Sequence, residues 1–545
     1  MDRYTIGLDY GSLSARGVLV NTATGAIVAE AEYPYPHAVM DTALPDGTPL
    51  GHDWALQHPQ DYMDALTVVV PALLERSGID PQQVIALGVD FTASSVIPLD
   101  RQLRPLCLHP EFQSDPYAYC MMWKHHAAQP YVQKLTEAVR RYDPQLLEYA
   151  GGKLGCESLV AKITQVCLEA PQVYEAAGCF AEAGDYITSL LAGRPVCGLS
   201  CAAAKALWTR EKGWPDGGLL GWVDPRLEDF YREKYIAKYP DCACGYPGER
   251  VGTLCPEMAR KLGLHTGVVL SAFQLDGYSS MPAVGAVRPG RAMVVVGTSL
   301  AVMLLDYYRR EVPGITASLP GCHIPGFHGY GSGQASLGDM FGWFVRSCVP
   351  QSYWQAAGER NMHSYLMELA SRLRPGESGL LVLEWWGGCK CLPDKKLSGT
   401  ILGLTMQTRP EEVYRALLEA AAFAARNLLE RHMSAGVPVE DVVVCGGIAG
   451  KNPLLMQIYA DVLGREIRVS HCAQAPALGT AIFAACAAGE DLNAASQRMG
   501  SREFTVYQPR EENRAVYDRL YAGYQQLYHY FGEQTELMGE LAALQ

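Results

Sequence analysis

A chain of 545 residues is too long for one ordinary hydrophobic core, so two large domains are expected. Apolar residues make up 49% of the chain and charged residues 19%, which is typical of soluble globular proteins. The net charge of −13 argues against nucleic acid or an anionic membrane as a partner, because both require basic surface stripes. No apolar run approaches the roughly 18 residues of a membrane span, and no leader segment is evident. A cytoplasmic protein is therefore expected.

The 17 cysteines are scattered along the chain and odd in number. The CAC run at residues 242–244 and the CKC run at residues 389–391 resemble fragments of metal sites. No C-x-x-C pair or matching histidine spacing completes such a site. We therefore interpret the cysteines as small buried apolar residues that stay reduced.

The first half of the chain opens with two apolar, strand-like runs at residues 4–10 and 14–21. The turn that joins them is rich in polar groups: Asp9, Gly11, Ser12, Ser14 and Arg16. Further along, periodicity predicts a helix at residues 58–78, a buried strand at 84–91 that leaves a polar tip, and helices around 157–170 and 183–192.

The second half alternates strands and helices more regularly. The pattern predicts a long amphipathic helix, a strand that ends in two glycines, a helix closed by glycine, a strand and another helix, at residues 410–432, 440–447, 452–464, 465–470 and 476–489. Such alternation predicts a layered α/β fold. We place the domain boundary near residue 270, which gives domains 1–269 and 270–545.

A strand–turn–strand pattern occurs in both halves of the chain. Residues 292–306 repeat the opening design of strand, glycine–hydroxyl turn and strand, so that Gly297-Thr298 matches Gly11-Ser12. Glycine lets a backbone N–H approach a ligand closely and the hydroxyl adds a donor, a combination that suits phosphate oxygens. Arg16 would add a fixed cation, and Asp9 could hold Mg²⁺ through water. The alternative is a pair of ordinary hairpin turns with solvated polar residues.

A third glycine site favours a nucleotide ligand. Gly446 and Gly447 end a predicted strand and Asn452 opens the next helix, so a flat adenine or a ribose could lie close to bare backbone. The stretch is not a P-loop, and no G-x-G-x-x-G occurs in the chain. The sequence therefore predicts nucleotide binding by another architecture.

Motifs along almost the whole chain resemble the ribonuclease H-like superfamily, within it the FGGY carbohydrate kinases, and among these the ribulokinases. The stretches that carry the resemblance include YPHAVMDTALPDGTPLGHDWALQHPQDY, GVDFTASS, WKHHAAQ, YAGGKLGCES, EAGDYI, GAVRPGRAMVVVGTS, GYGSGQASLGDMFGWF, LEWWGGCK and CGGIAGKNPLLMQIYADVLG. The resemblance implies two ribonuclease H-like domains of the actin/hexokinase superfamily around a central cleft. The domain at 1–269 would bind sugar and carry the first phosphate hairpin. The domain at 270–545 would carry the catalytic aspartate, the second hairpin and the adenosine site.

The resemblance also assigns chemistry. It implies a carbohydrate kinase that uses ATP and Mg²⁺ to phosphorylate a 2-ketopentose, L-ribulose to L-ribulose 5-phosphate first of all, as in arabinose catabolism. Asp276, which alone would be an ordinary turn former, becomes the expected catalytic base. The expected sugar contacts are Ala93, Trp123, Lys205 and Asp276. The expected ATP contacts are Gly11, Ser12, Arg16, Gly297, Thr298, Gly446, Gly447 and Asn452, with Asp9 at Mg²⁺.

Two alternatives remain open at this point. One is an FGGY kinase for another pentulose or polyol, such as D-ribulose, a xylulose or ribitol. It arises because Gly331 stands where the resembling kinases carry a glutamate that reaches the sugar. The other is an actin- or chaperone-like protein that uses ATP as a switch. A homodimer is compatible with the sequence, which does not determine the oligomeric state.

Overall fold

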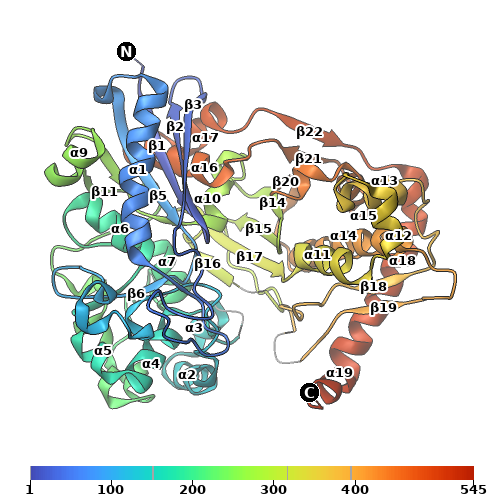
Figure 1. Cartoon of the computed structure of the whole chain (residues 1–545), viewed down its shortest axis with the longest axis horizontal. Coiled ribbons are helices and arrows are strands. Elements are labelled where there is room, and N and C mark those ends of the chain that lie inside the picture. The colour runs from blue at the N-terminus through green and yellow to red at the C-terminus, as the bar shows by residue number, and fades with distance from the viewer. Residues whose placement is uncertain (1, 150–151, 316, 393–395, 545) are drawn as a thin grey trace. The chain divides into compact units, whose positions relative to one another are not determined.

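Two seven-stranded sheets, each covered by helices, organise the chain in the computed structural model, which describes residues 2–149, 152–315, 317–392 and 396–544 (Figure 1). The chain divides into two compact units. Unit 1 comprises Met1–Val287, Ser318–Gly329 and Gln474–Ser501, and unit 2 comprises Arg288–Ala317, Tyr330–Ala473 and Arg502–Gln545. The boundary expected at residues 269/270 falls inside strand β12, which belongs to the sheet of unit 1.

The main sheet of unit 1 has the strand order β11-β12-β5-β1-β2-β3, with β13 paired to β5 beyond β12. β1 pairs antiparallel with β2 and parallel with β5, so the first predicted hairpin forms the middle of the sheet. The strands are β1 (Tyr4–Tyr10), β2 (Ser14–Asn21), β3 (Ile27–Pro34), β5 (Val84–Phe91), β11 (Arg250–Thr253), β12 (Val269–Ser271) and β13 (Gln274–Leu275).

Helices cover both faces of this sheet. The helices are α1 (Pro59–Ser77), α6 (Ala183–Ala192), α9 (Pro256–Leu262), α10 (Asp276–Ala283), α16 (Ala475–Ala487) and α17 (Leu492–Met499). A Cβ on Gly17 of β2 would meet Val69 of α1, whereas a Cβ on Gly7 of β1 would meet the backbone of α16 at Ala477. Paired residues on neighbouring strands share a face of the sheet, and successive residues of one strand face opposite sides. Gly17 pairs with Leu8, the residue after Gly7, so Gly17 and Gly7 face opposite sides and α1 and α16 cover opposite faces.

Glycine lets α16 approach the sheet closely. Gly7 and Gly88 are partners across β1 and β5, and both face α16. A Cβ on Gly7 would lie 1.9 Å from the carbonyl oxygen of Ala477, and one on Gly88 would lie 2.9 Å from that of Thr480. The predicted helix at 476–489 therefore exists, but it packs on the sheet formed by the first residues of the chain.

The rest of unit 1 is a smaller subdomain. It contains a four-stranded sheet, the strand pair β9 and β10, and helices α2 to α5, which lie together at the far end of this unit from the N-terminus (Figure 1). The sheet is built by β4 (Leu56–Gln57), β7 (Cys120–Met121), β6 (Val96–Leu99) and β8 (Cys179–Glu182). The other elements are α2 (Gln129–Tyr142), α3 (Pro144–Tyr149), α4 (Leu159–Glu169), α5 (Pro171–Ala176), β9 (Val196–Gly198), α7 (Leu199–Lys205), α8 (Gly217–Gly221) and β10 (Ala243–Gly245).

Unit 2 repeats the central arrangement of unit 1. In its sheet the strands run β17-β15-β14-β20-β21-β22, with β14 antiparallel to β15 and parallel to β20. The run β17-β15-β14-β20 matches β3-β2-β1-β5 of unit 1, so the predicted repeat of the opening hairpin is confirmed. The strands are β14 (Gly290–Val296), β15 (Leu300–Asp306), β17 (His328–Gln334), β20 (Val439–Cys445), β21 (Ile467–Ser470) and β22 (Phe504–Tyr507); β16 (Ala317–Pro320) precedes β17 in the chain.

The helices of unit 2 bury one contiguous apolar cluster with this sheet. The predicted long helix is α14, whose buried stripe includes Leu417, Leu418 and Phe423. The other elements are α11 (Leu337–Cys348), α12 (Gln351–Ala357), α13 (Met362–Ala370), β18 (Leu381–Leu383), β19 (Thr400–Leu402), α14 (Pro410–Ser434), α15 (Pro453–Leu463), α18 (Glu511–His529) and α19 (Leu537–Ala542).

Candidate active site

Three carboxylates meet at the ends of adjacent strands in unit 1. Asp9 of β1 is the register partner of Asp90 of β5, and β5 pairs in parallel with β13, directly before Asp276. Parallel strands end at the same edge of a sheet, so the topology brings together residues that lie up to 267 positions apart. Asp276 is the first residue of α10, and its Oδ1 accepts a hydrogen bond of 2.7 Å from the N–H of Gly277.

The surroundings of these carboxylates shift their titration. Burial, followed by the charge of Asp9, raises the pKa of Asp276 from 3.8 to about 7. Burial also raises the pKa of Asp9 and that of Asp90, although Arg16 opposes the shift at Asp9. A carboxylate with a pKa near neutrality can take a proton from a hydroxyl group at physiological pH.

Asp90 is a site residue that sequence reasoning missed. Its side chain is fully buried, and its Oδ2 accepts a 2.5 Å hydrogen bond from the hydroxyl of Thr480 on α16. Its Oδ1 receives no hydrogen bond from the residues that the structure describes. Burial beside a second carboxyl group disfavours the charged forms of Asp9 and Asp90, a cost that a bound cation would remove, and oxygen donors are those that Mg²⁺ prefers. The residues at this strand edge therefore fit a magnesium ion, with Asp9 and Asp90 as the groups that would hold it.

The hairpin turn of unit 1 is held by its neighbours. The side-chain amide of Gln57 donates to the carbonyl of Ser12 at 2.9 Å, and the indole N–H of Trp123 donates to the hydroxyl of Ser12 at 3.1 Å. The backbone N–H of Gly11 donates to the Ser14 carbonyl at 3.0 Å. Arg16 points along the same hairpin, 3.9 Å from Asp9 and 3.2 Å from Glu32. The turn is therefore fixed before any ligand binds.

The expected sugar-side residues all belong to unit 1. Ala93 lies in the tip after β5, where Ser94 adopts a left-handed φ of 61°. Trp123 is half-buried and touches the hairpin through Ser12, and the Lys124 ammonium lies 5.2 Å from its ring centre. Lys205 ends α7 and pairs with Glu157 at 3.6 Å.

A buried lysine ties the tip after β5 to the segment of Trp123. The Lys162 ammonium, on α4, donates to the carbonyls of Ser94, Met121 and Met122, the last at 2.8 Å. Glu182 supplies the opposite charge from β8 and accepts a 2.8 Å hydrogen bond from the N–H of Ser95. Burial lowers the pKa of Lys162 to about 8. Neither residue was predicted to have this role: Lys162 lies in a run with an ordinary helical pattern, and Glu182 begins the stretch EAGDYI, to which the resemblance assigned no contact.

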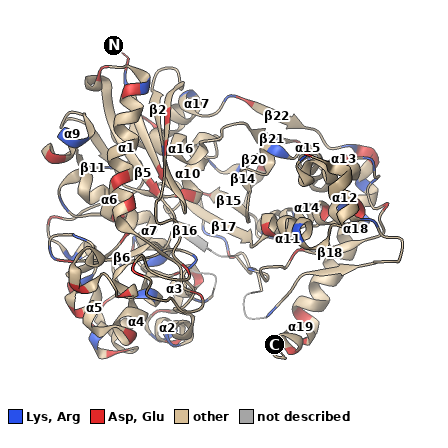
Figure 2. Cartoon of the chain, in the orientation of Figure 1, with Lys and Arg blue, Asp and Glu red and all other residues tan. Residues whose placement is uncertain are grey.

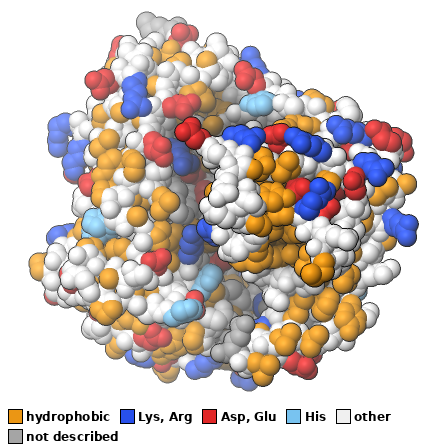
Figure 3. Space-filling model, turned by 45° about the vertical axis from the view of Figure 1, so that its right-hand side comes forward, with side chains coloured by type: hydrophobic (Ala, Val, Ile, Leu, Met, Phe, Trp, Pro, Cys, Tyr) orange, Lys and Arg blue, Asp and Glu red, His pale blue; other side chains and the backbone are white. Residues whose placement is uncertain are grey.

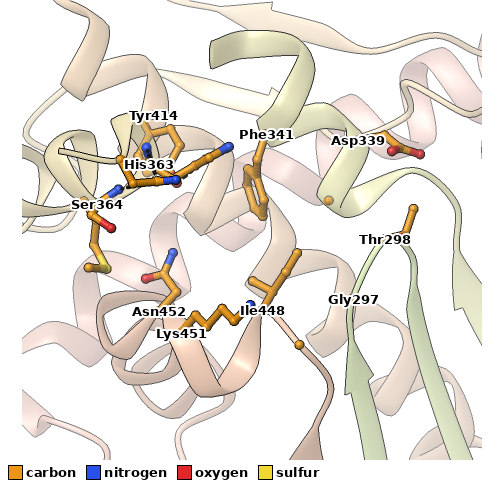
Figure 4. Close-up of a pocket in the computed structure, with 14 residues that line it drawn as sticks. Gly297, Thr298, Asp339, Phe341, His363, Ser364, Tyr414, Ile448, Lys451 and Asn452 are labelled. Atoms are coloured by element: carbon orange, nitrogen blue, oxygen red, sulfur yellow. Dashed lines mark hydrogen bonds between the residues drawn. The ribbon is translucent and has the colours of Figure 1, made fainter. Parts of the chain in front are cut away.

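Unit 2 contains a pocket of about 880 Å³. It is lined by Gly297, Thr298, Gly338, Asp339, Phe341, Asn361, His363, Ser364, Met367, Tyr414, Gly447, Ile448, Lys451 and Asn452. Gly297 and Thr298 lie at one end, and His363 and Tyr414 at the other (Figure 4). Five residues of the second half of the chain were predicted to contact ATP, and four of them line the pocket: Gly297, Thr298, Gly447 and Asn452. Gly446 does not line it.

Close backbone approach shapes the end of this pocket that Gly297 and Thr298 line. The N–H of Gly338 donates to the carbonyl of Thr298 at 2.9 Å, and a Cβ on Gly338 would lie 2.9 Å from the Gly297 carbonyl oxygen. Gly446 has a φ of 108°, and its Cβ would lie 2.5 Å from the oxygen of Val296. Gly446 therefore lets β20 turn against β14, and Gly447 then faces the pocket.

The other end of the pocket carries aromatic and hydrogen-bonding side chains. Tyr414 and Phe341 supply aromatic surface, and His363 Nδ1 lies 3.2 Å from the Tyr414 hydroxyl. Burial and the charge of Arg346 lower the pKa of His363, so its imidazole is neutral. Asn452 uses its Oδ1 to cap α15 at Leu455, which leaves its NH₂ group as the donor for a ligand. Tyr414 lies in the stretch GTILGLTMQTRPEEVYRALLEA, which resembles the C-terminal signature of the FGGY kinases but was assigned no contact, and His363 of α13 lies in no such stretch.

The position expected to carry a glutamate has no carboxylate. Gly331 lies in β17, and the following Ser332 is buried with its hydroxyl 2.9 Å from Nε2 of His432 on α14. Burial lowers the pKa of His432 to about 4, so this is a contact between neutral groups. Ser332 is therefore part of the buried core of unit 2, where its hydroxyl contacts His432.

Charge is mixed over both units. Basic and acidic residues are interspersed along their helices and loops (Figure 2), and the face in Figure 3 likewise intersperses the two signs. Among the described residues, no helix combines the length and apolar character needed to cross a membrane.

Comparison with known proteins identifies the class. Residues 4–283 match the N-terminal domain, and residues 292–488 the C-terminal domain, of the FGGY family of carbohydrate kinases. The chain therefore belongs to the FGGY family of carbohydrate kinases. Its fold is the two-domain actin/hexokinase-like fold of sugar kinases, as the sequence predicted.

Individual relatives and one solved structure show which FGGY kinases the chain is similar to. The chain is 42% identical to "Ribulokinase" of Halalkalibacterium halodurans over 99% of this chain and 97% of that protein. It is 39% identical to "Ribulokinase" of Mycolicibacterium smegmatis over 99% of this chain and 96% of that protein. The crystal structure of xylulose kinase from Rhodospirillum rubrum has the same fold, with a TM-score of 0.79 and 23% identity over 96% of this chain and 98% of that chain.

Proposed function

We propose that the protein transfers the γ-phosphoryl group of ATP, with Mg²⁺, to the terminal hydroxyl of a 2-ketopentose, L-ribulose first of all. The product would be L-ribulose 5-phosphate. The observation that carries this proposal is the likeness to ribulokinases over nearly the whole chain, together with the carboxylate cluster at one strand edge of a carbohydrate kinase.

In this proposal Asp276 is the general base. It directly follows β13 and is partly buried, and its raised pKa suits proton transfer near neutrality. It would accept the proton of the sugar hydroxyl as the bond to phosphorus forms. Ala93, Trp123 and Lys205 would orient the sugar, with the Trp123 ring against its C–H surface.

The phosphates and the metal are assigned to the two hairpins. Gly11, Ser12 and Arg16 in unit 1, and Gly297 and Thr298 in unit 2, offer N–H, hydroxyl and guanidinium donors to phosphate oxygens. Adenosine would occupy the pocket near Gly447 and Asn452, with Gly446 shaping the backbone there. Mg²⁺, when bound, neutralises charge on the transferring phosphoryl group. Asp9, supported by Asp90, would hold it.

ADP release distinguishes the kinase function from that of a protein that uses ATP as a switch. ADP release is followed with and without each 2-ketopentose. A kinase produces ADP and a sugar phosphate in equal amounts when its sugar is present. ADP release that no sugar stimulates would refute the kinase proposal and favour a switch protein.

A second candidate function is an FGGY kinase for another pentulose or polyol, and it rests on Gly331. A hydrogen bond to a charged group is worth about 1.5–3 kcal/mol. Without the carboxylate, kcat/KM for the sugar should be roughly 10- to 150-fold lower than in a kinase that carries the glutamate. We expect L-ribulose to lead D-ribulose and the xyluloses by a narrow margin. The test is kcat/KM for the four 2-ketopentoses, ribitol and glycerol. A sharp preference for one ketopentose would contradict the narrow margin, and a best substrate outside the ketopentoses would contradict the ribulokinase assignment.

A further inference from the structure

Two histidines and a buried aspartate meet at the start of α1, outside the residues assigned to sugar and nucleotide. His37 follows β3, His58 is the N-cap residue of α1, and Asp61 lies in the first turn of that helix. One potential ligand atom from each of the three lies within 4.8 Å of the others. Among the described residues, no other set of three or more His, Cys, Asp or Glu side chains meets this criterion.

The contacts within the cluster orient its donor atoms. His37 Nδ1 lies 2.7 Å from Asp61 Oδ1, and the backbone N–H of His37 donates to Asp61 Oδ2 at 3.1 Å. The two imidazole rings stack at 4.3 Å with an angle of 18° between their planes. His58 Nδ1 accepts the N–H of Gln60 at 3.2 Å, so its ring is held by the helix cap.

The donor set suits a transition-metal cation better than Mg²⁺. Two imidazoles and one carboxylate are the ligands preferred by Zn²⁺ and its neighbours, whereas Mg²⁺ selects oxygen. A tetrahedral ion with bonds of about 2.1 Å needs ligand atoms roughly 3.4 Å apart. His37 Nδ1 and Asp61 Oδ1 lie 2.7 Å apart and the three ligand atoms lie within 4.8 Å of one another, so a bound ion would require side-chain shifts, for which the 34% exposed His37 side chain has room.

Charge and burial favour a cation at the same place. The Asp61 side chain is 3% exposed, so its negative charge is poorly solvated. Asp64, one turn further along α1, adds a second carboxylate whose charge acts on His58. A bound divalent ion would balance these charges and leave one position for water.

The cluster is connected to the hairpin turn of unit 1. The segment of His37 contacts the turn through Tyr35, whose N–H donates to the Leu13 carbonyl at 2.9 Å. The segment of His58 contacts it through Gln57, which donates to the Ser12 carbonyl at 2.9 Å. An ion that joins the two segments would therefore brace the turn from both sides.

We propose that His37, His58 and Asp61 form a binding site for one divalent transition-metal ion of the Zn²⁺ class, separate from the Mg²⁺ of the kinase reaction. The ion links the segment after β3 to the first turn of α1 and stabilises unit 1.

Titration of the full chain with CoCl₂ tests the proposal, because Co²⁺ reports its ligands by visible absorption. The protein is kept reduced and saturated with Mg²⁺, which fills oxygen-only sites. We expect one Co²⁺ per chain, d–d absorption without a thiolate charge-transfer band, and a higher Tm. The absence of the thiolate band matters because the chain has 17 free cysteines.

Two variants and a matched control locate the ion. His37→Gln and His58→Ser should each weaken Co²⁺ binding at least about tenfold, and serine at residue 58 retains an N-cap acceptor. His109→Gln is the control, because His109 makes a similar 3.0 Å contact with Asp100 but belongs to no such cluster; it should bind Co²⁺ as the unmodified protein does. Absence of saturable binding, a thiolate band on the bound ion, or unchanged affinity in both cluster variants would overturn the proposal.

Discussion

Replacement of Asp276 by asparagine removes the proposed base while it preserves the shape of the side chain. Asparagine can still accept the N–H of Gly277, so the start of α10 should keep its geometry. Asp276 lies in unit 1, and the pocket proposed for adenosine is lined by residues of unit 2. The substitution should therefore change turnover and leave ATP affinity nearly unchanged.

The expected loss follows from the role of the group. A positioned general base contributes about 10²- to 10⁴-fold to the rate, so kcat of Asp276→Asn should fall by that factor. The pKa of about 7 adds a pH signature, because only the ionised carboxylate accepts a proton. In the unmodified enzyme, kcat/KM should fall about tenfold between pH 8 and pH 6. If Mg²⁺ binds Asp9 as proposed, it would offset the charge that adds to burial in raising this pKa, so saturating Mg²⁺ should shift the acid limb to lower pH.

A coupled assay of ADP formation with L-ribulose measures kcat, and titration calorimetry measures ATP affinity. Asp241→Asn, which neutralises an exposed carboxylate, serves as the matched control and should keep full activity. The base assignment would be refuted if kcat of Asp276→Asn stayed within a few-fold of that of the unmodified enzyme. Loss of ATP affinity in parallel with kcat would instead indicate a structural role.

Three further substitutions test other parts of the structure. Thr298→Val removes one hydroxyl donor near the phosphates and should weaken ATP binding by about 1–2 kcal/mol in calorimetry; unchanged affinity and turnover would mean that Thr298 does not face them. Gly7→Ala places a methyl group 1.9 Å from the Ala477 oxygen and should lower the unfolding free energy by about 3 kcal/mol in urea titrations, whereas an unchanged midpoint would contradict the packing of α16 on β1. Lys162→Met leaves three carbonyls without their donor and should raise KM for the sugar and lower stability by about 1–3 kcal/mol, without a change in ATP affinity.

Local sequence determined much of this protein. Alternating apolar runs joined by glycine–hydroxyl turns specify the two hairpins, because a strand and a tight turn depend on neighbouring residues. The glycine that ends β20, and the Asn452 cap of α15, could likewise be recognised from short stretches. Family resemblance, carried by motifs along the chain, then pointed to Asp276, which no local pattern distinguishes from an ordinary turn residue.

Tertiary structure decided what lies beside these motifs. The helix α16 follows the strands of unit 2 in the chain, yet its Thr480 contacts Asp90 in unit 1, because Gly7 and Gly88 leave room for it on that sheet. Lys162 holds the tip after β5 through carbonyls of two distant segments, and a backbone carbonyl carries no sequence signature. Periodicity specifies which face of an element is buried, but the partner that buries it depends on which strands and helices meet in space.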